Sequence, residues 1–298
     1  MNSIQCKTLM SAALLGTLAG FSPAYGGPIL GSDLASFTVL GSSEVTNVPT
    51  STITGNVGVW PGSAITGFDS SSGDAVSDPQ VTSGLVHSST ALAESAQGQL
   101  TTAINNLSSL GGGTTLSLAD LAGLTLTPGV YTLPAGTTNL SGTVTLDGED
   151  NANAAWVFQM PSTLITSPNS VVNMINAGSG AGLFWNVGSS ATIDVNSTFL
   201  GNILASESIS MNTTATDVCG RALASNGAVT LQQNSLSGIC TGMLAGSDGL
   251  SGGLDVSSDG SGVTILPSST IATVPLPSPL ILMGLGLAGL VLRRRRHG

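Results

Sequence analysis

The stretches Ala191-Thr-Ile-Asp194, Ile209-Ser-Met-Asn212 and Val229-Thr-Leu-Gln232 decide the fold, because they repeat one short pattern at offsets of 18 and 20 residues. Each copy alternates apolar and polar residues, which is typical of a strand with one buried side. One such strand in every 20 or so residues predicts a β-solenoid, in which each turn buries its apolar side chains by stacking on the next turn.

Two earlier stretches share this local form, Val144-Thr-Leu-Asp147 and, less completely, Thr52-Ile-Thr54. Most of the remaining chain consists of short apolar segments separated by Gly, Asn, Ser and Pro, which indicates further short strands and turns. A β-sandwich of short strands is the alternative that these residues leave open.

Residues 78–110 predict one long helix, over 79–110, with Asp78 as N-cap and Pro79 in the first turn. Glu94 is its only charged residue after Asp78, so we expect the helix to lie against the solenoid along much of its length. Its apolar stripe is Leu85, Leu92, Ala96, Leu100, Ala103 and Leu107.

Charge placement excludes two classes of function. Between residues 8 and 292 the only basic residue is Arg221, whereas all 16 acidic residues lie between Asp33 and Asp259. Nucleic-acid binding and phosphate handling both require clustered basic side chains, so neither is compatible with this body. An apolar fraction of 41% with only 7% charged residues indicates a folded protein and not a disordered one.

The N-terminal residues have the layout of a secretory signal peptide, which we place at residues 1–26. Lys7 precedes an apolar stretch from Leu9 to Phe21, and small residues follow around Ala24-Tyr-Gly26. The apolar stretch is too short for a stable membrane span. A buried N-terminal helix is the alternative.

The C-terminal residues 274–298 combine Val274-Pro-Leu-Pro-Ser-Pro279, an apolar run over 280–292 and four arginines. This tail resembles bacterial sorting signals of the Pro-Glu-Pro type, which an exosortase-like membrane enzyme cuts. A permanent membrane anchor is the alternative. Both interpretations predict export, to the cell envelope, the extracellular matrix or the medium, with membrane contact only through the terminal segments.

Removal of the leader would leave two cysteines, Cys219 and Cys240, in an oxidising compartment, which favours a disulfide. They are 21 residues apart, about one turn. Stacked turns lie about 4.8 Å apart, within the Cα separation that a disulfide tolerates. We expect neither a metal site nor a cofactor, since the mature body contains one histidine within it, His87.

Outward positions on the repeated strands are the candidate functional residues, because the intervening Ile, Val, Leu and Met face the core. The first expected column is Thr145, Thr192, Ser210 and Thr230, followed two residues on by Asp147, Asp194, Asn212 and Gln232. The second is Asn196 with Thr198, Thr214 with Thr216, and Asn234. Ladders of Thr and Asn also stabilise solenoids without any binding role, which is the alternative.

Seven stretches resemble the microbial ice-binding domain family over roughly residues 29–241. They are Phe37-Thr-Val-Leu-Gly41, Ile53-Thr-Gly-Asn-Val-Gly-Val-Trp-Pro-Gly62, Leu124-Thr-Leu-Thr-Pro-Gly-Val-Tyr131, Ala155-Trp-Val-Phe-Gln159, Leu183-Phe-Trp-Asn-Val-Gly-Ser-Ser190, Phe199-Leu-Gly-Asn-Ile-Leu-Ala205 and Gly220-Arg-Ala-Leu-Ala224. The resemblance implies a right-handed, discontinuous β-solenoid of triangular section with a long helix alongside, and ice adsorption on one flat face. It also implies a structural role for Arg221 at a turn corner.

A motif of that family, Thr-(Ala/Gly)-x-(Thr/Asn), is matched only in part. Thr213-Thr-Ala-Thr216 comes near it, with Thr214 where a small residue is expected. The neighbouring turns have Val195-Asn-Ser-Thr198 and Gln233-Asn-Ser-Leu236 instead.

The sequence thus predicts a monomeric, exported ice-binding protein that inhibits freezing or recrystallisation. Its partners are the ice crystal and the sorting enzyme. We divide it into the leader, a solenoid domain over 27–245, a Gly/Ser/Asp-rich flexible linker over 246–273, and the sorting tail. A passive surface or matrix adhesin is the second hypothesis.

A polysaccharide lyase or hydrolase is the third hypothesis, which the sequence disfavours. A glycosidase requires two facing carboxylates. The densest acidic group, Asp147, Glu149 and Asp150, is typical of a solvated turn. His87, placed in the predicted helix, has no evident partner there.

Overall fold

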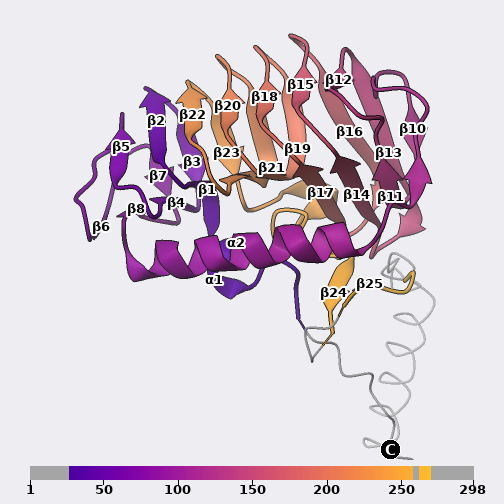
Figure 1. Ribbon diagram of the computed structural model, residues 1–298, viewed down its shortest axis with the longest axis horizontal. Helices are drawn as coiled ribbons and strands as arrows, with labels where there is room; N and C mark the ends of the chain where they lie inside the picture. The colour runs from indigo at the N-terminus through magenta and orange to yellow at the C-terminus, as the bar shows by residue number, and fades with distance from the viewer. Residues whose placement is uncertain (1–26, 258–261, 270–298) are drawn as a thin grey trace, which may run out of the picture.

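Strands on three sides, almost all of them parallel, surround an apolar core in the computed structural model, which describes residues 27–257 and 262–269 (Figure 1). The chain crosses three sides in each turn, so the solenoid has a triangular section, as the family resemblance implies. The predicted leader and the tail from residue 270 onward lie outside the described residues.

The three sides of the triangle are the covered face, the seven-strand face and the third face. The covered face lies next to the long helix α2 (Ala91–Ser109). In spatial order it contains β6 (Ala75–Val76), β8 (Val86–Ser88), β4 (Asn56–Val59), β1 (Phe37–Gly41), the second halves of β21 (Thr216–Ala224) and β19 (Thr198–Ala205), β17 (Gly182–Val187), β14 (Ala155–Met160), β11 (Gly129–Thr132) and β9 (Thr114–Thr115). The seven-strand face contains β12 (Thr138–Leu140), β15 (Leu164–Thr166), β18 (Ala191–Ile193), β20 (Ile209–Met211), β22 (Val229–Gln232), β2 (Glu44–Val48) and β5 (Ala64–Thr66). The third face contains β10 (Thr125–Leu126), β13 (Thr143–Asn151), β16 (Val171–Ala177), β23 (Ser235–Ser237), β3 (Thr52–Thr54), β7 (Val81–Thr82) and the first halves of β19 and β21.

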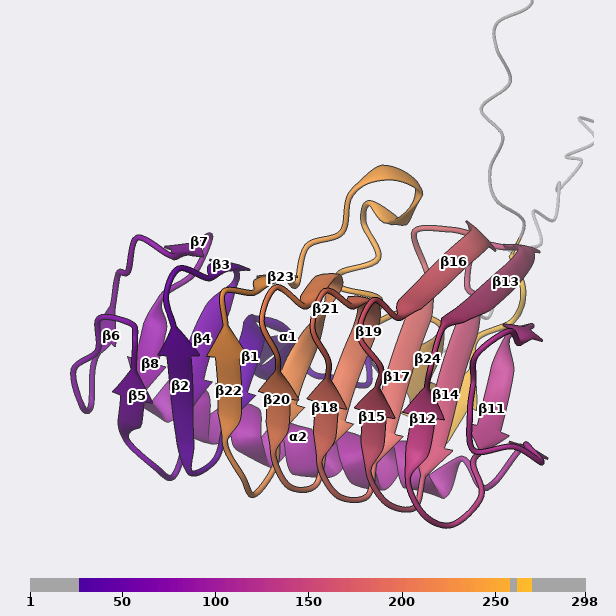
Figure 2. The same cartoon turned by 90° about the horizontal axis from the view of Figure 1, so that it is seen from above.

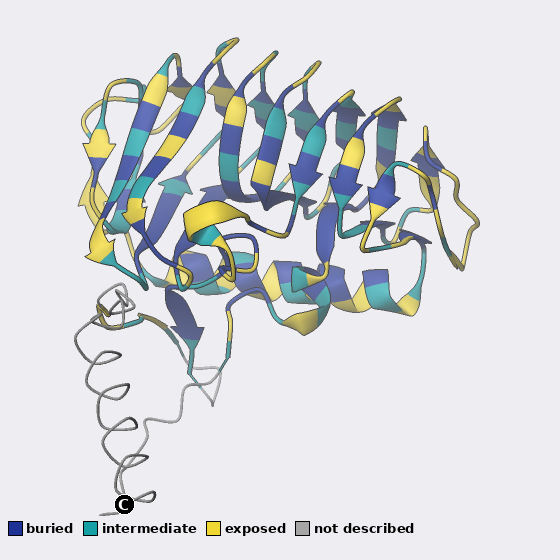
Figure 3. Cartoon of the chain, turned by 180° about the vertical axis from the view of Figure 1, so that it is seen from behind, coloured by how far each residue is buried: buried dark blue, intermediate teal, exposed yellow. Residues whose placement is uncertain are grey.

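The repeat found in the sequence is the structural repeat. Ala191, Ile209 and Val229 lie side by side in β18, β20 and β22. These residues are buried, and buried residues alternate with more exposed ones along the strands of the two uncovered faces (Figure 3). Aromatic side chains stack between turns as well, with ring centroids of Phe158 and Trp185 4.4 Å apart. The apolar positions therefore gain their burial from the neighbouring turns.

The order of turns in space differs from their order in the sequence. The N-terminal strands β1, β2 and β3 pair on one side with β21, β22 and β23, from the late part of the chain. On the other side they pair with β4, β5 and β7, which follow them in sequence. Figure 1 shows the early β2 beside the late β22. The discontinuity that the family resemblance implies is thereby confirmed.

The long helix is shorter than the sequence predicts. α2 spans Ala91–Ser109, and its N-cap is Thr90, whose side chain accepts a hydrogen bond from the Ala93 amide at 3.2 Å. The predicted start at Asp78 is wrong, because residues 79–90 contain β7 and β8, which pair with β3 and β4. The Asp78 carboxylate instead caps a turn, accepting from the Gln80 amide at 2.7 Å. Strand pairing of β7 and β8 therefore decides the structure of this segment, although Leu85 lies at helical spacing from Leu92.

The helix packs on the covered face, as predicted. Its buried residues Ala93, Ala96, Leu100, Ala103 and Leu107 contact an apolar cluster from the strands beneath. Gln97 is also buried, and its amide donates to the carbonyls of Gly41 and Ala224 at 3.0 and 3.1 Å. A short helix, α1 (Ser32–Ala35), precedes β1.

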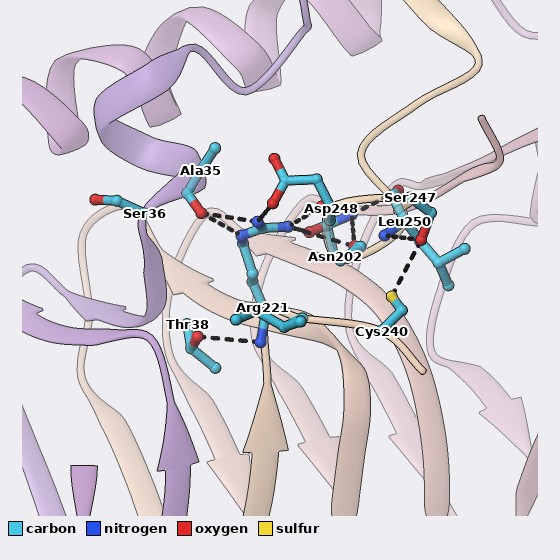
Figure 4. Close-up of polar contacts among 12 residues, drawn as sticks. Ala35, Ser36, Thr38, Asn202, Arg221, Cys240, Ser247, Asp248 and Leu250 are labelled. Atoms are coloured by element: carbon cyan, nitrogen blue, oxygen red, sulfur yellow. Dashed lines mark hydrogen bonds and ion pairs between the residues drawn. The ribbon is translucent and has the colours of Figure 1, made fainter. Parts of the chain in front are cut away.

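Arg221 is fully buried at the corner between the third and covered faces (Figure 4). Its guanidinium donates to the carbonyl of Ala35 at 2.7 Å, to the side-chain oxygen of Asn202 at 2.9 Å and to the Asp248 carboxylate at 3.1 Å. These partners come from the first turn, the middle of the solenoid and the C-terminal segment. The structural role predicted for Arg221 is confirmed.

A carboxyl group is buried beside this arginine. Asp217 points into the core, because its position is in register with Phe199 and Leu236, both buried. Neither carboxyl oxygen has a hydrogen-bond partner of acceptable geometry among the described residues. Burial raises the pKa of Asp217 to about 8, and nearby amides of Cys219 and Gly201 together with Arg221 only partly oppose that shift.

Much of the predicted linker is packed against the solenoid. Leu250 and Leu254 are buried, and β24 (Leu254–Val256) pairs antiparallel with β25 (Val263–Ile265). The prediction of a flexible segment from residue 246 is therefore wrong for these residues. Asp248, Gly249 and Leu250 have positive φ values. The Gly-, Ser- and Asp-rich composition of this segment therefore forms tight turns and not a flexible linker.

The predicted disulfide between Cys219 and Cys240 is present, with the Cα atoms 4.7 Å apart. It joins β21 to the segment that follows β23, next to the packed C-terminal residues. It therefore lies at the margin of the solenoid's hydrogen-bonded ladders.

We expect the double substitution Cys219→Ala with Cys240→Ala to lower the free energy of unfolding by about 3 kcal/mol, the chain-entropy value for a loop of this length. The solenoid should persist, because its sheets do not depend on this bond. Circular dichroism should be unchanged at low temperature, and amide hydrogen exchange should accelerate mainly in residues 238–250. Alkylation of both cysteines in the exported protein without reductant would contradict the prediction.

Candidate functional site

The seven-strand face, whose strands lie side by side in Figure 2, carries one column of registered outward residues through its centre. Thr192, Ser210 and Thr230 are in register, as the sequence predicts. The hydroxyl of Thr46 donates to that of Thr230 at 3.2 Å, which links the early turn to the late one. In spatial order the column is Asn139, Ile165, Thr192, Ser210, Thr230, Thr46 and Thr66.

Two flanking columns widen this surface. The positions two residues before the central column are Thr137, Thr163, Ser190, Ser208, Ala228, Glu44 and Ala64. The positions two residues after the central column include Ser141, Ser167, Asp194, Asn212, Gln232 and Val48. Glu44 and Asp194 are the only ionisable residues in the three columns, so the surface consists mainly of hydroxyl, methyl and amide groups.

Neighbouring side chains fix the later flanking column. Asn212 donates to the Asp194 carboxylate at 2.8 Å, and Thr213 donates to the Gln232 side-chain oxygen at 3.1 Å. The bond from Asn212, together with one from the Val195 amide, lowers the pKa of Asp194, so this carboxylate stays ionised at neutral pH.

The second predicted column is a corner between the seven-strand and third faces. Asn196 and Thr214 both adopt left-handed backbone conformations, with φ of 57° and 60°, and their side chains are hydrogen-bonded. Their equivalent in the next turn is Gln233, at φ 54°, and not Asn234. Asn234 is buried and donates to the carbonyls of Asn212 and Ala215 at 2.8 and 2.9 Å. Its assignment as an outward residue is wrong by one position.

The third face holds the remaining predicted site residues. Thr198 and Thr216 are in register there, and Thr213 lies at the exposed corner that leads to this face. Thr145 belongs to the third face as well, paired with Thr125 and Asn173. Its alignment with Thr192 is therefore wrong, because the two lie on different sides of the triangle. Their two strands have the same alternation of apolar and polar residues, so the sequence pattern does not distinguish one face from the other.

Register differs between the two exposed faces. The pairings of the seven-strand face contain no register shift, whereas those of β13 with β16 and of β19 with β21 both do. Val218 and Ile239 are 44% and 54% exposed beside the third face, and Ile165 and Val48 are 40% and 56% exposed on the seven-strand face, so both faces bear exposed apolar side chains. The sequence could not show that the seven-strand face also includes Thr46 and Thr66, since these belong to turns displaced in the sequence.

The acidic turn offers no pair of facing carboxylates. Asp147 accepts from the Glu149 amide at 3.0 Å and from Asn176 at 2.9 Å, and these bonds lower its pKa. Glu149 and Asp150 have positive φ values in the turn itself. His87 lies in β8 and not in the helix, buried against Phe37 and bonded to Thr90.

Metal-ligand clusters and membrane-spanning helices are both absent from the described residues. Within residues 27–257 and 262–269, no group of three or more His, Cys, Asp or Glu could hold a metal ion. No helix in those ranges is long and apolar enough to cross a membrane.

Two family profiles match the chain. The profile described as "Ice-binding-like" matches residues 39–237, and the one described as "PEP-CTERM protein-sorting motif" matches residues 273–296. An ice-binding protein of Nostoc sp. is 43% identical over 206 residues, which cover 69% of this chain and 72% of that protein.

Solved structures agree with these matches. A crystal structure of an ice-binding protein from an Antarctic biological consortium is 34% identical, with a TM-score of 0.61 over 72% of this chain and 93% of that one. The ice-binding protein of the Antarctic ascomycete Antarctomyces psychrotrophicus is 32% identical, with a TM-score of 0.62 over 69% and 95%.

Proposed function

The chain belongs to the family of ice-binding-like domains, and from this premise we propose that it adsorbs to ice through its seven-strand face. The observation that carries the proposal is the uninterrupted central column, in which five of seven positions are Thr or Ser. The relatives named for ice binding support it at the level of the whole domain.

The spacing of this surface suits an ordered layer of water. Neighbouring strands lie about 4.8 Å apart, and alternate residues along a strand about 6.6 Å apart, so outward groups form a regular grid. Each Thr presents a methyl and a hydroxyl group to that layer. Water-mediated contacts approach direct hydrogen bonds in enthalpy, so many repeated positions acting together give firm adsorption.

The seven-strand face is favoured over the third face for two reasons. Its register is continuous, which keeps the grid straight over seven strands. On the third face, the pairing of β13 with β16 shifts register between Asp147 and Asn151, and β16 and β19 share a single registered pair, Val171 with Thr198. A crystal surface is planar, so the straighter sheet offers more simultaneous contacts.

The same arrangement supports a role in binding without catalysis. The outward columns hold hydroxyl and amide groups, and their two carboxylates, Glu44 and Asp194, lie on opposite flanks of the central column. The described acidic turn at Asp147 is stabilised by its own amides. Adsorption through one face requires no second copy, so we propose a monomer.

The sorting motif indicates export and association with the bacterial cell envelope. We propose that an exosortase-like enzyme processes it and that residues 1–26 are a removed leader. A surface-held domain favours the second candidate function, an envelope adhesin, and this role is compatible with ice adsorption.

A thermal hysteresis and ice-recrystallisation assay of residues 27–269 tests the proposal. The segment extends to residue 269 because Leu250 and Leu254 belong to the core. We expect shaped crystals and a freezing point below the melting point, at concentrations where an unrelated protein of similar mass has no effect. A folded, monodisperse sample that leaves crystals unshaped would leave the adhesin as the function.

A further inference from the structure

The first described residue lies against a buried carboxylate. The Gly27 nitrogen donates to the Asp255 carboxylate at 2.7 Å, and Asp255 is 7% exposed. The Gly27 carbonyl accepts from the Val256 amide at 2.9 Å, so the two residues form an antiparallel bridge at β24. Figure 1 shows these first residues, in indigo, running from α1 to the side of β24. The N-terminal residues are therefore joined to the C-terminal segment through the backbone of Gly27.

The surroundings of the Gly27 nitrogen favour positive charge. Two hollows flank Gly27, one beside α2 and one beside the C-terminal segment. Their lining includes two carboxylates, Asp255 and Asp248, and no basic side chain. In residues 27–257 and 262–269 the only Lys or Arg is Arg221, and its guanidinium bonds to Asp248. A cation at the Gly27 nitrogen is thus attracted by the nearest charged side chain, Asp255.

The sequence predicts a cleavage site at this same nitrogen. Gly26 and Ala24 are small residues at the first and third positions before it, which is the pattern that a leader peptidase requires. Hydrolysis adds water across the peptide bond, so the leader keeps a new carboxylate and Gly27 gains an ammonium group. The leader also contains Lys7, the single lysine of the sequence. The new ammonium is then the only primary amine in the mature chain.

We propose that removal of the leader between Gly26 and Gly27 creates an N-terminal ammonium group that binds the Asp255 carboxylate and fastens β24 to the first turn. The proposal rests on the proposed removal of the leader and is independent of ice adsorption. The ammonium adds a full positive charge and two further donors to a bond that the peptide amide already makes. Salt screens a partly buried ion pair of this kind only weakly. Cleavage thereby completes a contact between the two ends of the domain.

N-terminal sequencing of the exported protein tests the cleavage site. We expect Gly27 as the first residue, followed by Pro28. A retained leader would overturn both this proposal and the removal of the leader on which it rests. A different first residue would overturn the site and the ion pair, and would leave removal of the leader intact.

Acylation of the amine tests the ion pair, because the mature chain offers an N-hydroxysuccinimide ester one amine to react with. The ester reacts only with the neutral amine, and a carboxylate partner raises the pKa of the amine. We expect the folded wild type at pH 7 to react about tenfold more slowly than the same protein in urea, as for a pKa rise of about one unit. Asp255→Asn, which keeps the shape of the side chain, should react at nearly the same rate folded and unfolded.

The matched control is Asp150→Asn, an exposed carboxylate that lines neither hollow, and it should be protected as the wild type is. Equal protection in the wild type and Asp255→Asn would overturn the ion pair, since simple burial of the amine then explains the slow reaction. If Asp255→Asn does not fold, an NMR titration of the wild-type Gly27 amine decides. A midpoint equal to that of the free peptide Gly-Pro-Ile-Leu would overturn the proposal, and a midpoint about one unit higher would support it.

Discussion

Lysines at Thr192 and Thr230 together should reduce thermal hysteresis and crystal shaping to a small fraction of the wild-type values. Both threonines lie in the central column of the seven-strand face, two rungs apart, with Ser210 between them. An ammonium group holds its own hydration shell tightly, and its four-carbon stem rises above a grid of short side chains. Ordered water that fits the crystal cannot form over both rungs.

The fold should tolerate this change. Exposed substitutions usually alter stability by no more than about 0.5 kcal/mol, so the melting temperature should fall by only a few degrees. The matched control is Thr198→Lys with Thr216→Lys, two registered threonines of the third face. Loss of activity in the control pair, with full activity in the first pair, would transfer the ice contact to the third face.

Asp217→Asn should remove a large pH dependence of stability. The pKa of Asp217 is raised to about 8 in the folded protein by burial, compared with an ordinary value near 3.8. The folded state therefore keeps a proton that the unfolded state releases, and stability falls as pH rises from about 4 to about 8. A shift of this size corresponds to a change on the order of 5 kcal/mol, at 1.36 kcal/mol per pKa unit.

Urea unfolding at a series of pH values between 4 and 8.5 measures the effect. The wild type should lose stability toward the upper end, and Asp217→Asn should be flatter and more stable than wild type at pH 8. His87 works in the opposite direction, because burial lowers its pKa below 6.5, so the difference between the two proteins isolates Asp217. Asp147→Asn, at an exposed carboxylate whose pKa is lowered, is the control. Parallel curves for wild type and Asp217→Asn would show that the carboxyl is ionised in the fold.

The repeats that are adjacent in the sequence could be predicted, because their apolar positions recur at the spacing of one turn. Thr192, Ser210 and Thr230 were found in this way. Thr46 and Thr66 could not be, since their neighbours in the sheet come from a distant part of the chain. Thr145 was misassigned because strand periodicity is the same on every side of a triangle.

Other errors have equally specific causes. The residues after Asp78 satisfy helical capping rules, yet Val81 and Val86 pair with Ile53 and Val57, and such pairing over a distance is not visible in local spacing. The position of Asn234 was wrong because the turn after β22 is one residue shorter than the turn after β20, which moves the left-handed residue to Gln233. Gly- and Ser-rich composition beyond residue 245 concealed two buried leucines.

The insertion of β1, β2 and β3 between the late strands and β4 sets the order in which the protein can assemble. Thr46 bonds to Thr230, 184 residues away in sequence, so the first strands to leave the secretion channel have no neighbour on one side until nearly the whole domain has followed. Their pairing with β4, β5 and β7 can form early, but the contacts on the other side require closing this long loop, which makes folding slow. A truncation before residue 224 therefore leaves the N-terminal turn as an open sheet edge that invites aggregation.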